Sequence, residues 1–211
     1  MAVSKLSRVY NKPRGSVDSD IYLVGAIEAP EDYLEELQTL REATADEHIT
    51  IYINSGGGRV DTAVQMLAGI RNSAAKVTCV IEGVCHSAAT YIFLAADEWI
   101  VNHNSLMLVH NYSGGAYGKG GDLVDNVIAN DRWVKNLMVD VYKGFLTDEE
   151  LDSVVRLNQD IWLETDQINE RLQQVVILRQ EATLLHEEAM REEVKRKLKE
   201  LSDETDEEVT S

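Results

Sequence analysis

Hydrophobic and polar positions along the first half of the chain alternate between two patterns. Apolar runs rich in β-branched and aromatic residues predict strands over residues 20–27, 48–55, 76–82 and 105–112. Between these runs, apolar positions recur every three to four residues and predict helices over residues 30–43, from Val60 onward, and over residues 86–96. Strands that are almost wholly apolar and alternate with helices are typical of a mainly parallel sheet covered on both faces. The pattern therefore predicts an α/β fold.

The second half of the chain carries two amphipathic patterns of helical period. After Asp122, one predicted helix has an apolar face formed by Val124, Val127, Val134, Met138 and Val141. Further on, a stripe repeats every seven residues at Ile168, Val175, Ala182 and Ala189, joined by Leu172, Leu178 and Leu185. It predicts a long helix that packs on a neighbour, forms a short coiled coil, or lies on its own domain. Residues 202–211 contain five acids and no base, which predicts a solvated, disordered tail.

Composition narrows the classes of function. With 211 residues, of which 44% are hydrophobic and 27% charged, the chain suits one compact domain with an appendage. A net charge of −17 argues against non-specific binding to nucleic acid. No apolar run approaches the ~20 residues of a membrane-spanning helix, and none resembles a signal peptide. Cys79 and Cys85 lie in or beside one apolar stretch, so we expect no long-range disulfide and a reducing, cytoplasmic setting.

One hydroxyl stands among small residues just after the strand predicted over residues 76–82. Ser87 lies in the stretch GVCHSAAT, where an ordinary turn would prefer Asn, Asp, Gly or Pro, and this makes it a candidate nucleophile. Among the five histidines, His110 ends an apolar strand, where α/β sheets gather functional groups. His86 adjoins Ser87, and its side chain is expected to diverge from the hydroxyl. A triad also needs an acid, and the 37 acidic residues leave that choice open.

Two glycine clusters follow predicted strands. The stretch NSGGGRVD over residues 54–61 fits either a strand-to-helix turn or a backbone whose N–H groups face a ligand. It lacks the lysine and the spacing of a phosphate-binding loop. The stretch YSGGAYGKGGD over residues 112–122 has five glycines. It fits a flexible loop or an extended segment that pairs with a peptide by strand addition.

Five segments together resemble the Clp protease proteolytic subunit (ClpP) family. They are IYINSGGGRV, GVCHSAAT, NSLMLVHN, GGAYGKGGDL and NQDIWLE, in the order and approximate spacing of that family, over about residues 21–172. The resemblance implies a ClpP/crotonase-like core of repeated β-β-α units, a handle made of a strand and a helix, and here a C-terminal helical extension. It places the nucleophile at Ser87, the base at His110 and the orienting acid at Asp160.

The resemblance also implies an oxyanion hole and a substrate groove. By position, the oxyanion donors are the backbone N–H groups of Gly58 and Ala88, each worth roughly 3 kcal/mol in comparable sites. The substrate would lie along Gly57, Gly114, Gly115 and Ala116. No metal and no cofactor is implied. Two departures from the family pattern are Gly56 in place of its proline and Ala88-Ala89 in place of Met-Gly.

The expected organisation has four parts. Residues 1–19 form a short N-terminal segment, residues 20–172 the serine peptidase domain with its handle at about 112–145, residues 173–201 an amphipathic helix, and residues 202–211 the acidic tail. About twenty residues precede the first predicted strand, which leaves little room for the family's axial loop and first helix. This counts against docking to an AAA+ unfoldase.

The predicted function is a cytoplasmic serine endopeptidase that cleaves unfolded or extended polypeptides inside a homo-oligomeric chamber. A capsid-maturation protease of the same family, acting without an ATPase, is an alternative role. A crotonase-type acyl-CoA enzyme would share the fold and hold a thioester enolate with two backbone amides. A non-catalytic assembled scaffold is the alternative outside enzymology. Lys119 as base and Cys85 as nucleophile fit the pattern less well than His110 and Ser87 do.

Overall fold

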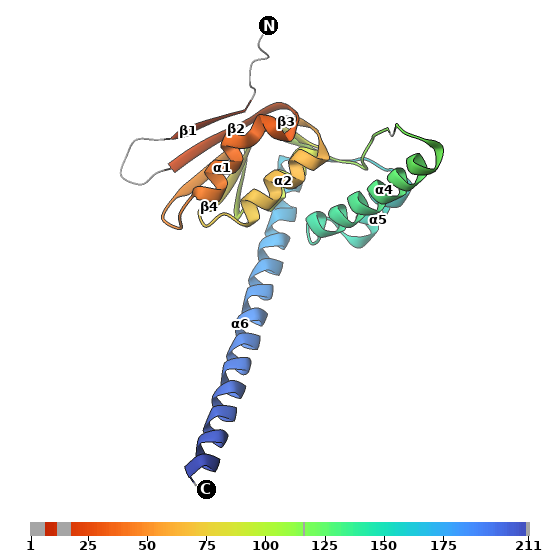
Figure 1. The fold of residues 1–211 in the computed structure, drawn as a ribbon. Helices are drawn as coiled ribbons and strands as arrows, with labels where there is room; N and C mark the ends of the chain where they lie inside the picture. Colours follow the sequence, from red (N-terminus) through yellow and green to blue (C-terminus); the bar gives the residue numbers. More distant parts are fainter. Residues whose placement is uncertain (1–6, 12–17, 116, 210–211) are drawn as a thin grey trace. The chain divides into compact units, whose positions relative to one another are not determined.

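A single sheet forms the centre of the computed structural model, which describes residues 7–11, 18–115 and 117–209 (Figure 1). Over these residues the sheet has seven strands: β1 (Ser7–Asn11), β2 (Asp18–Ile27), β3 (His48–Gly58), β4 (Lys76–His86), β5 (Glu98–Val101), β6 (Leu106–Val109) and β7 (Ile161–Glu164). Their order is β1-β2-β3-β4-β6-β7, and β5 also pairs with β4. Strands β1 and β7 pair antiparallel with their neighbours, and all other pairs are parallel. The predicted α/β fold is confirmed.

Helices connect the strands or follow the last of them. They are the short 3₁₀ helix η1 (Pro30–Tyr33), α1 (Leu34–Glu42), α2 (Val60–Arg71), α3 (Ala88–Ala95), α4 (Gly120–Tyr142), α5 (Asp148–Leu157) and α6 (Thr165–Val209). In the core, alternate residues of β3 are almost completely buried, namely Ile49, Ile51 and Ile53. Helix α3 is buried at every position, because its residues are small or apolar all around its axis.

The opposite face of the sheet is less completely covered than the apolar runs predicted. Tyr22 and Tyr52 point there, between the buried positions of β2 and β3, and both are only partly buried. Their rings stack with centroids 4.9 Å apart across paired strands. An aromatic pair of this kind shields the backbone of two adjacent strands without a covering helix.

Several strands differ from the predicted ones: β5 and β7 were not predicted, and β6 ends at Val109 where a strand to residue 112 was predicted. Strand β1 was also not predicted, and it pairs with β2 from Ser7 opposite Leu23 to Asn11 opposite Ser19. Strand β3 continues through its glycines to Gly58, and β4 continues to His86, well past their apolar cores. Both extensions are stabilised by pairing with neighbouring strands, which apolar periodicity does not report.

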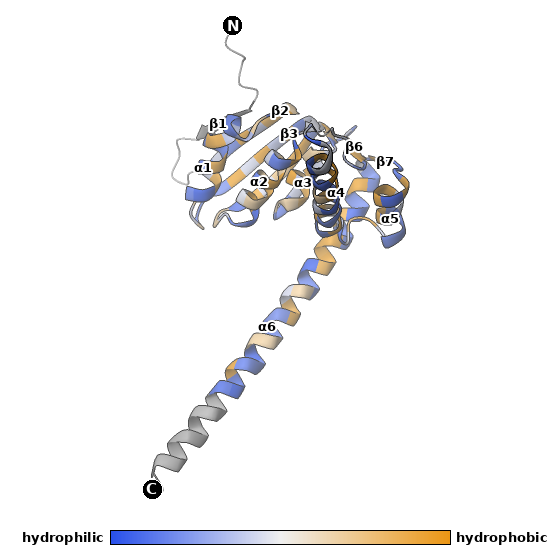
Figure 2. Cartoon of the chain, turned by 45° about the vertical axis from the view of Figure 1, so that its right-hand side comes forward, coloured by the Kyte–Doolittle hydropathy of each residue, from blue (hydrophilic) through white to orange (hydrophobic). Residues whose placement is uncertain are grey.

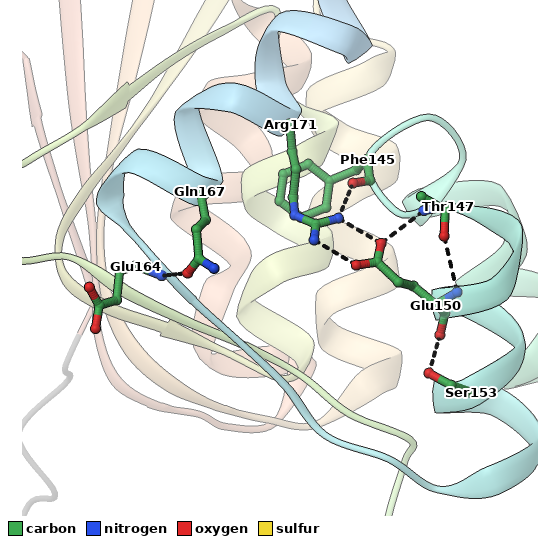
Figure 3. A network of polar contacts seen from close by, with 7 residues as sticks. All are labelled: Phe145, Thr147, Glu150, Ser153, Glu164, Gln167 and Arg171. Carbon is green, nitrogen blue, oxygen red and sulfur yellow. Dashed lines mark hydrogen bonds and ion pairs between the residues drawn. The ribbon is translucent and has the colours of Figure 1, made fainter.

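The segment that leads back into the sheet is fixed by a capped helix and an ion pair. Thr147 and Glu150 form a reciprocal capping box at the start of α5. Arg171 of α6 makes two hydrogen bonds to the Glu150 carboxylate, at 2.7 and 2.6 Å, and a third to the Phe145 carbonyl at 3.2 Å (Figure 3). These contacts anchor the first turns of α6 to α5.

The chain divides into two compact units between Leu172 and Gln173, within α6. In the second unit, hydrophobic and polar residues are interspersed along the helix (Figure 2), and large apolar side chains including Ile177, Leu184 and Leu185 are exposed. The helix continues to Val209, where the sequence predicted a disordered tail from residue 202. Extending an existing helix avoids the cost of nucleation, which a composition-based prediction does not include. None of the described helices combines the length and apolar character needed to cross a membrane.

Candidate active site

Ser87 lies on a sharp turn between β4 and α3. Strand β4 ends at His86 and α3 begins at Ala88, so the single residue between them reverses the chain. Ser87 has φ 55° and ψ −129°, a conformation that non-glycine residues rarely adopt and that costs about 1–3 kcal/mol. Hydrogen bonds on both sides hold it there: its N–H donates to the Leu108 carbonyl at 2.8 Å, and its carbonyl accepts from the Thr90 N–H at 2.9 Å.

His110 lies next to this turn because of the pairing between β4 and β6. These strands are parallel, with His86 opposite Leu108. The bond from Ser87 to Leu108 continues that pairing by one step, and His110 follows two residues after Leu108. The imidazole is half-buried, one residue beyond the end of β6. The backbone pairing therefore brings the predicted nucleophile and the predicted base to the same corner of the sheet.

Asp160 reaches the same corner through antiparallel pairing. The β6–β7 ladder ends with Val109 opposite Ile161, and His110 and Asp160 are the residues directly beyond this last pair. A second link joins the flanking residues: the Asn111 amide donates to the Asn158 side chain at 2.8 Å. Asp160 itself is exposed. Among the described residues, no hydrogen bond or ion pair joins the His110 side chain to either Ser87 or Asp160.

Gly57 lies directly against the turn at Ser87. A β-carbon built on Gly57 would lie 2.6 Å from the His86 carbonyl oxygen, 2.7 Å from the Ser87 β-carbon and 3.1 Å from the Ala88 nitrogen. Its φ of +88° also favours glycine. The Gly57 N–H donates to the Ser55 hydroxyl at 3.1 Å. Gly58 lies against β2, because a β-carbon built on it would come within 2.3 Å of the Ile27 carbonyl oxygen.

Most of the second glycine cluster lies outside any helix or strand, and its last residues, Gly120–Asp122, begin α4. Residues 110–115 and 117–119 have no regular secondary structure, and Gly114 and Gly115 are exposed with open space around them. Ala116 lies outside the described residues. Strand β6 ends at Val109, before this cluster, so pairing of this segment with a peptide stays a prediction.

His86 has surroundings that the sequence did not predict. Its ring contacts Trp162 edge to face, with centroids 5.3 Å apart, and its Nε2 is buried without a hydrogen-bond partner among the described residues. Burial lowers the pKa of the His86 imidazole, and the nearby His110 adds to this shift. His86 and Trp162 are both opposite Leu108 in the sheet, on the two strands that flank β6.

Both cysteines are free and buried. Burial raises the pKa of the Cys85 thiol well above its usual range, which disfavours the thiolate that a nucleophilic cysteine needs. Cys85 is therefore poorly suited to act as a nucleophile. In the part of the chain that the structure describes, no group of three or more His, Cys, Asp or Glu side chains could hold a metal ion.

Comparison with known proteins gives a consistent result. A sequence model of the Clp protease family matches residues 17–171. The ATP-dependent Clp protease proteolytic subunits 3 of Rhizobium etli and Rhizobium johnstonii are each 27% identical to this chain over 128 residues. These matches cover 59% of this chain, which thus spans 65% of the length of either relative. A mutant of ClpP1 from Listeria monocytogenes shares the fold, with a TM-score of 0.57 and 22% identity, covering 72% of this chain and 86% of that one.

Proposed function

This chain belongs to the Clp protease family, and on that premise we propose that it is a serine endopeptidase with Ser87 as its nucleophile. The observation that carries the proposal is the backbone at Ser87, a non-glycine residue at φ 55° held beside β6, the strand that ends one residue before His110. A strained, firmly held serine at the start of a helix has its hydroxyl presented at the end of the sheet, where a substrate has access.

The mechanism follows from the three residues at this corner. Ser87 Oγ attacks the carbonyl carbon of a peptide bond while His110 accepts its proton. The C–N bond then breaks as His110 returns that proton to the leaving amine, and a water activated by His110 hydrolyses the acyl-enzyme. Asp160 fixes the tautomer of His110 and stabilises its cation. The side-chain hydrogen bonds among the three form when substrate binds, as is common where a free enzyme has looser catalytic contacts.

The tetrahedral oxyanion is bound by the backbone N–H groups of Gly58 and Ala88. Contact between Gly57 and the Ala88 nitrogen supports this assignment, because it sets the glycine segment beside the second donor. The Gly57 N–H is already donated to Ser55, which leaves the next amide as the donor from this segment. An extended substrate lies along Gly57, Gly114 and Gly115, with Ala116 continuing the same segment.

The proposed enzyme acts on unfolded polypeptides within a homo-oligomeric chamber. Large apolar side chains of α4 are exposed on the single chain, namely Val124, Val127, Ile128, Trp133 and Val139. Apolar surface of this extent on one helix is typical of a surface that is buried in an assembly. The free, buried cysteines fit the cytoplasmic setting that we propose. We do not propose an AAA+ unfoldase as a partner.

Labelling with a fluorophosphonate tests the nucleophile. We expect the wild-type chain to be modified at Ser87, as mapped by peptide mass spectrometry, and Ser87→Ala to lose both labelling and hydrolysis of dye-labelled casein. Ser73→Ala, in the turn between α2 and β4, is the matched control and keeps both. An assembled but unlabelled wild-type protein would favour the non-catalytic scaffold, and unlabelled protein with acyl-CoA turnover would favour the crotonase-type enzyme.

Asp160→Asn tests the orienting acid. We expect kcat to fall by about 10⁴ because the asparagine amide favours the wrong tautomer of His110. The control Asp46→Asn changes an exposed aspartate in the turn before β3 and leaves kcat unchanged. A wild-type kcat for Asp160→Asn would move the role to a neighbouring acid such as Glu164.

A further inference from the structure

A buried chain of hydroxyl groups links the end of α4 to the turn at Ser87. The Thr90 hydroxyl donates to the Ser87 carbonyl at 2.6 Å, and the same oxygen lies 2.6 Å from the Tyr142 hydroxyl. Thr90 and Tyr142 are both completely buried, so water does not compete for these bonds. Tyr142 is the last residue of α4, more than fifty positions from Thr90 along the chain.

The donor in each of these two hydrogen bonds follows from the number of protons that each hydroxyl carries. A threonine hydroxyl has one proton, and at Thr90 that proton is given to the Ser87 carbonyl. Tyr142 must therefore donate to Thr90. Burial raises the pKa of the Tyr142 phenol well above its ordinary value, and burial raises the pKa of the adjacent Tyr91 to about 12. The Tyr142 phenol thus stays protonated and can donate the hydrogen bond.

Fixing the Ser87 carbonyl also fixes the Ala88 N–H. These two groups belong to one planar peptide unit and point in opposite directions. A carbonyl that accepts from Thr90 therefore turns the Ala88 N–H away from Thr90, and a β-carbon built on Gly57 would lie 3.1 Å from the Ala88 nitrogen. Rotation of this peptide would reverse both groups and present an oxygen where the oxyanion needs a donor.

We propose that Thr90 and Tyr142 are positioning residues that hold the Ser87–Ala88 peptide in the orientation required for the oxyanion hole. The inference rests on the proposed serine peptidase function and goes beyond it, because neither residue touches the substrate. Tyr142 acts through Thr90, and Thr90 acts through the Ser87 carbonyl. Each bond thus stabilises a conformation that the serine would otherwise leave.

The test compares Thr90→Val, Thr90→Ser and Tyr142→Phe with the wild type. A displaced oxyanion donor slows the chemical step, so we expect Thr90→Val to lower kcat on dye-labelled casein and the rate of fluorophosphonate labelling by about 10- to 100-fold, with KM within about twofold. Tyr142→Phe has a smaller effect of several-fold. Thr90→Ser restores the hydroxyl and the rate, and the Thr90→Val, Tyr142→Phe double variant is no slower than Thr90→Val alone.

A matched control separates positioning from general stability. The buried hydroxyl of Thr62 donates to the Glu28 carbonyl at 2.7 Å, so Thr62→Val removes a similar bond from another helix start. We expect Thr62→Val and Thr90→Val to lower the melting temperature by similar amounts, while Thr62→Val keeps kcat. If Thr90→Val does not fold, Tyr142→Phe decides the question by its kcat and labelling rate.

Two outcomes overturn different claims. If wild type is labelled at Ser87 but Thr90→Val and Tyr142→Phe react at the wild-type rate, the positioning role is wrong and the peptidase proposal stands. If wild type is neither labelled nor active, the peptidase proposal fails and the positioning role fails with it. A fall in kcat that Thr62→Val reproduces also overturns the positioning role, because it would reflect stability alone.

Discussion

At the scale of single residues, Gly57 is the glycine of its cluster whose built β-carbon would meet the turn at Ser87. It faces the backbone and β-carbon of the turn at Ser87 at distances too short for a side chain. Its neighbour Gly56 has nothing within 4 Å of a built β-carbon and no positive φ. Of these two adjacent positions, only Gly57 therefore requires a glycine.

Gly57→Ala is expected to lower casein hydrolysis by on the order of 100-fold, because the methyl group displaces Ser87 or the Ala88 N–H from its working position. Gly56→Ala is the control and keeps near wild-type activity. Initial rates at saturating casein, with melting temperatures measured in parallel, check both. A Gly57→Ala protein as active as Gly56→Ala would show that the turn and the glycine segment are not held together during catalysis.

At the scale of secondary-structure elements, the Glu150–Arg171 pair joins α5 to the start of α6. The two bonds are charge-assisted and bidentate, and the two side chains are 30% and 23% exposed, so solvent screens them only partly. The Arg171 guanidinium holds the pKa of the Glu150 carboxyl below its usual range. Because β7 lies between these helices in the chain and follows Asp160, this anchor also fixes the strand that brings the acid to the site.

Glu150→Gln is expected to lower the unfolding free energy by about 1 kcal/mol at pH 7, because the glutamine keeps the capping bond to Thr147 and loses the ion pair. A carboxyl whose pKa is lowered in the folded state contributes stability above its unfolded pKa, and that stability is lost as pH falls through the folded pKa. The difference between wild type and Glu150→Gln should therefore shrink below about pH 4.5. Urea denaturation from pH 7 to pH 3.5 measures it.

The control lies on the same helix. Asp152 and Arg156 form an exposed pair at 2.8 Å, with side chains 50% and 75% exposed. Asp152→Asn should cost only a few tenths of a kcal/mol, as exposed pairs one helical turn apart usually do. Equal losses for Asp152→Asn and Glu150→Gln would mean that partial burial gives the Glu150 pair no advantage.

At the scale of the whole molecule, the exposed apolar residues of α4 predict self-association. We expect the purified chain to sediment at micromolar concentration as a homo-oligomer, and Ile128→Asp to shift it toward a single chain. A charge in the centre of a buried apolar contact costs several kcal/mol. Leu34→Asp is the control, since Leu34 is an exposed leucine of α1. Analytical ultracentrifugation that finds a wild-type monomer would contradict the chamber.

Local sequence was sufficient to predict most elements of the first half of the chain and two of the candidate site residues. Apolar periodicity is a local property, so it identified the strands around Ile51 and Val80 and the helix from Val60 without any knowledge of their partners. Ser87 and His110 can be recognised as candidates because each comes at the end of an apolar run. Ser87 is not one of the residues that an ordinary turn prefers, and His110 is polar where the run before it is apolar. Asp160 came from the resemblance to a family, not from periodicity.

Which distant residues lie near one another depends on tertiary packing. Antiparallel pairing between β6 and β7 brings the residues before Ile161 to the end of β6, and the hydroxyl chain from Tyr142 to Ser87 depends on where α4 ends. Strand β1 and the last residues of β4 likewise form strands because they pair with β2 and β6. Hydrophobic spacing reflects the period of a single helix or strand, so it can be seen in a short stretch of sequence. Pairing register and buried hydrogen bonds depend on residues that are far apart in the chain. Local sequence therefore specifies most of the elements and the reactive residue types, whereas packing sets how they align.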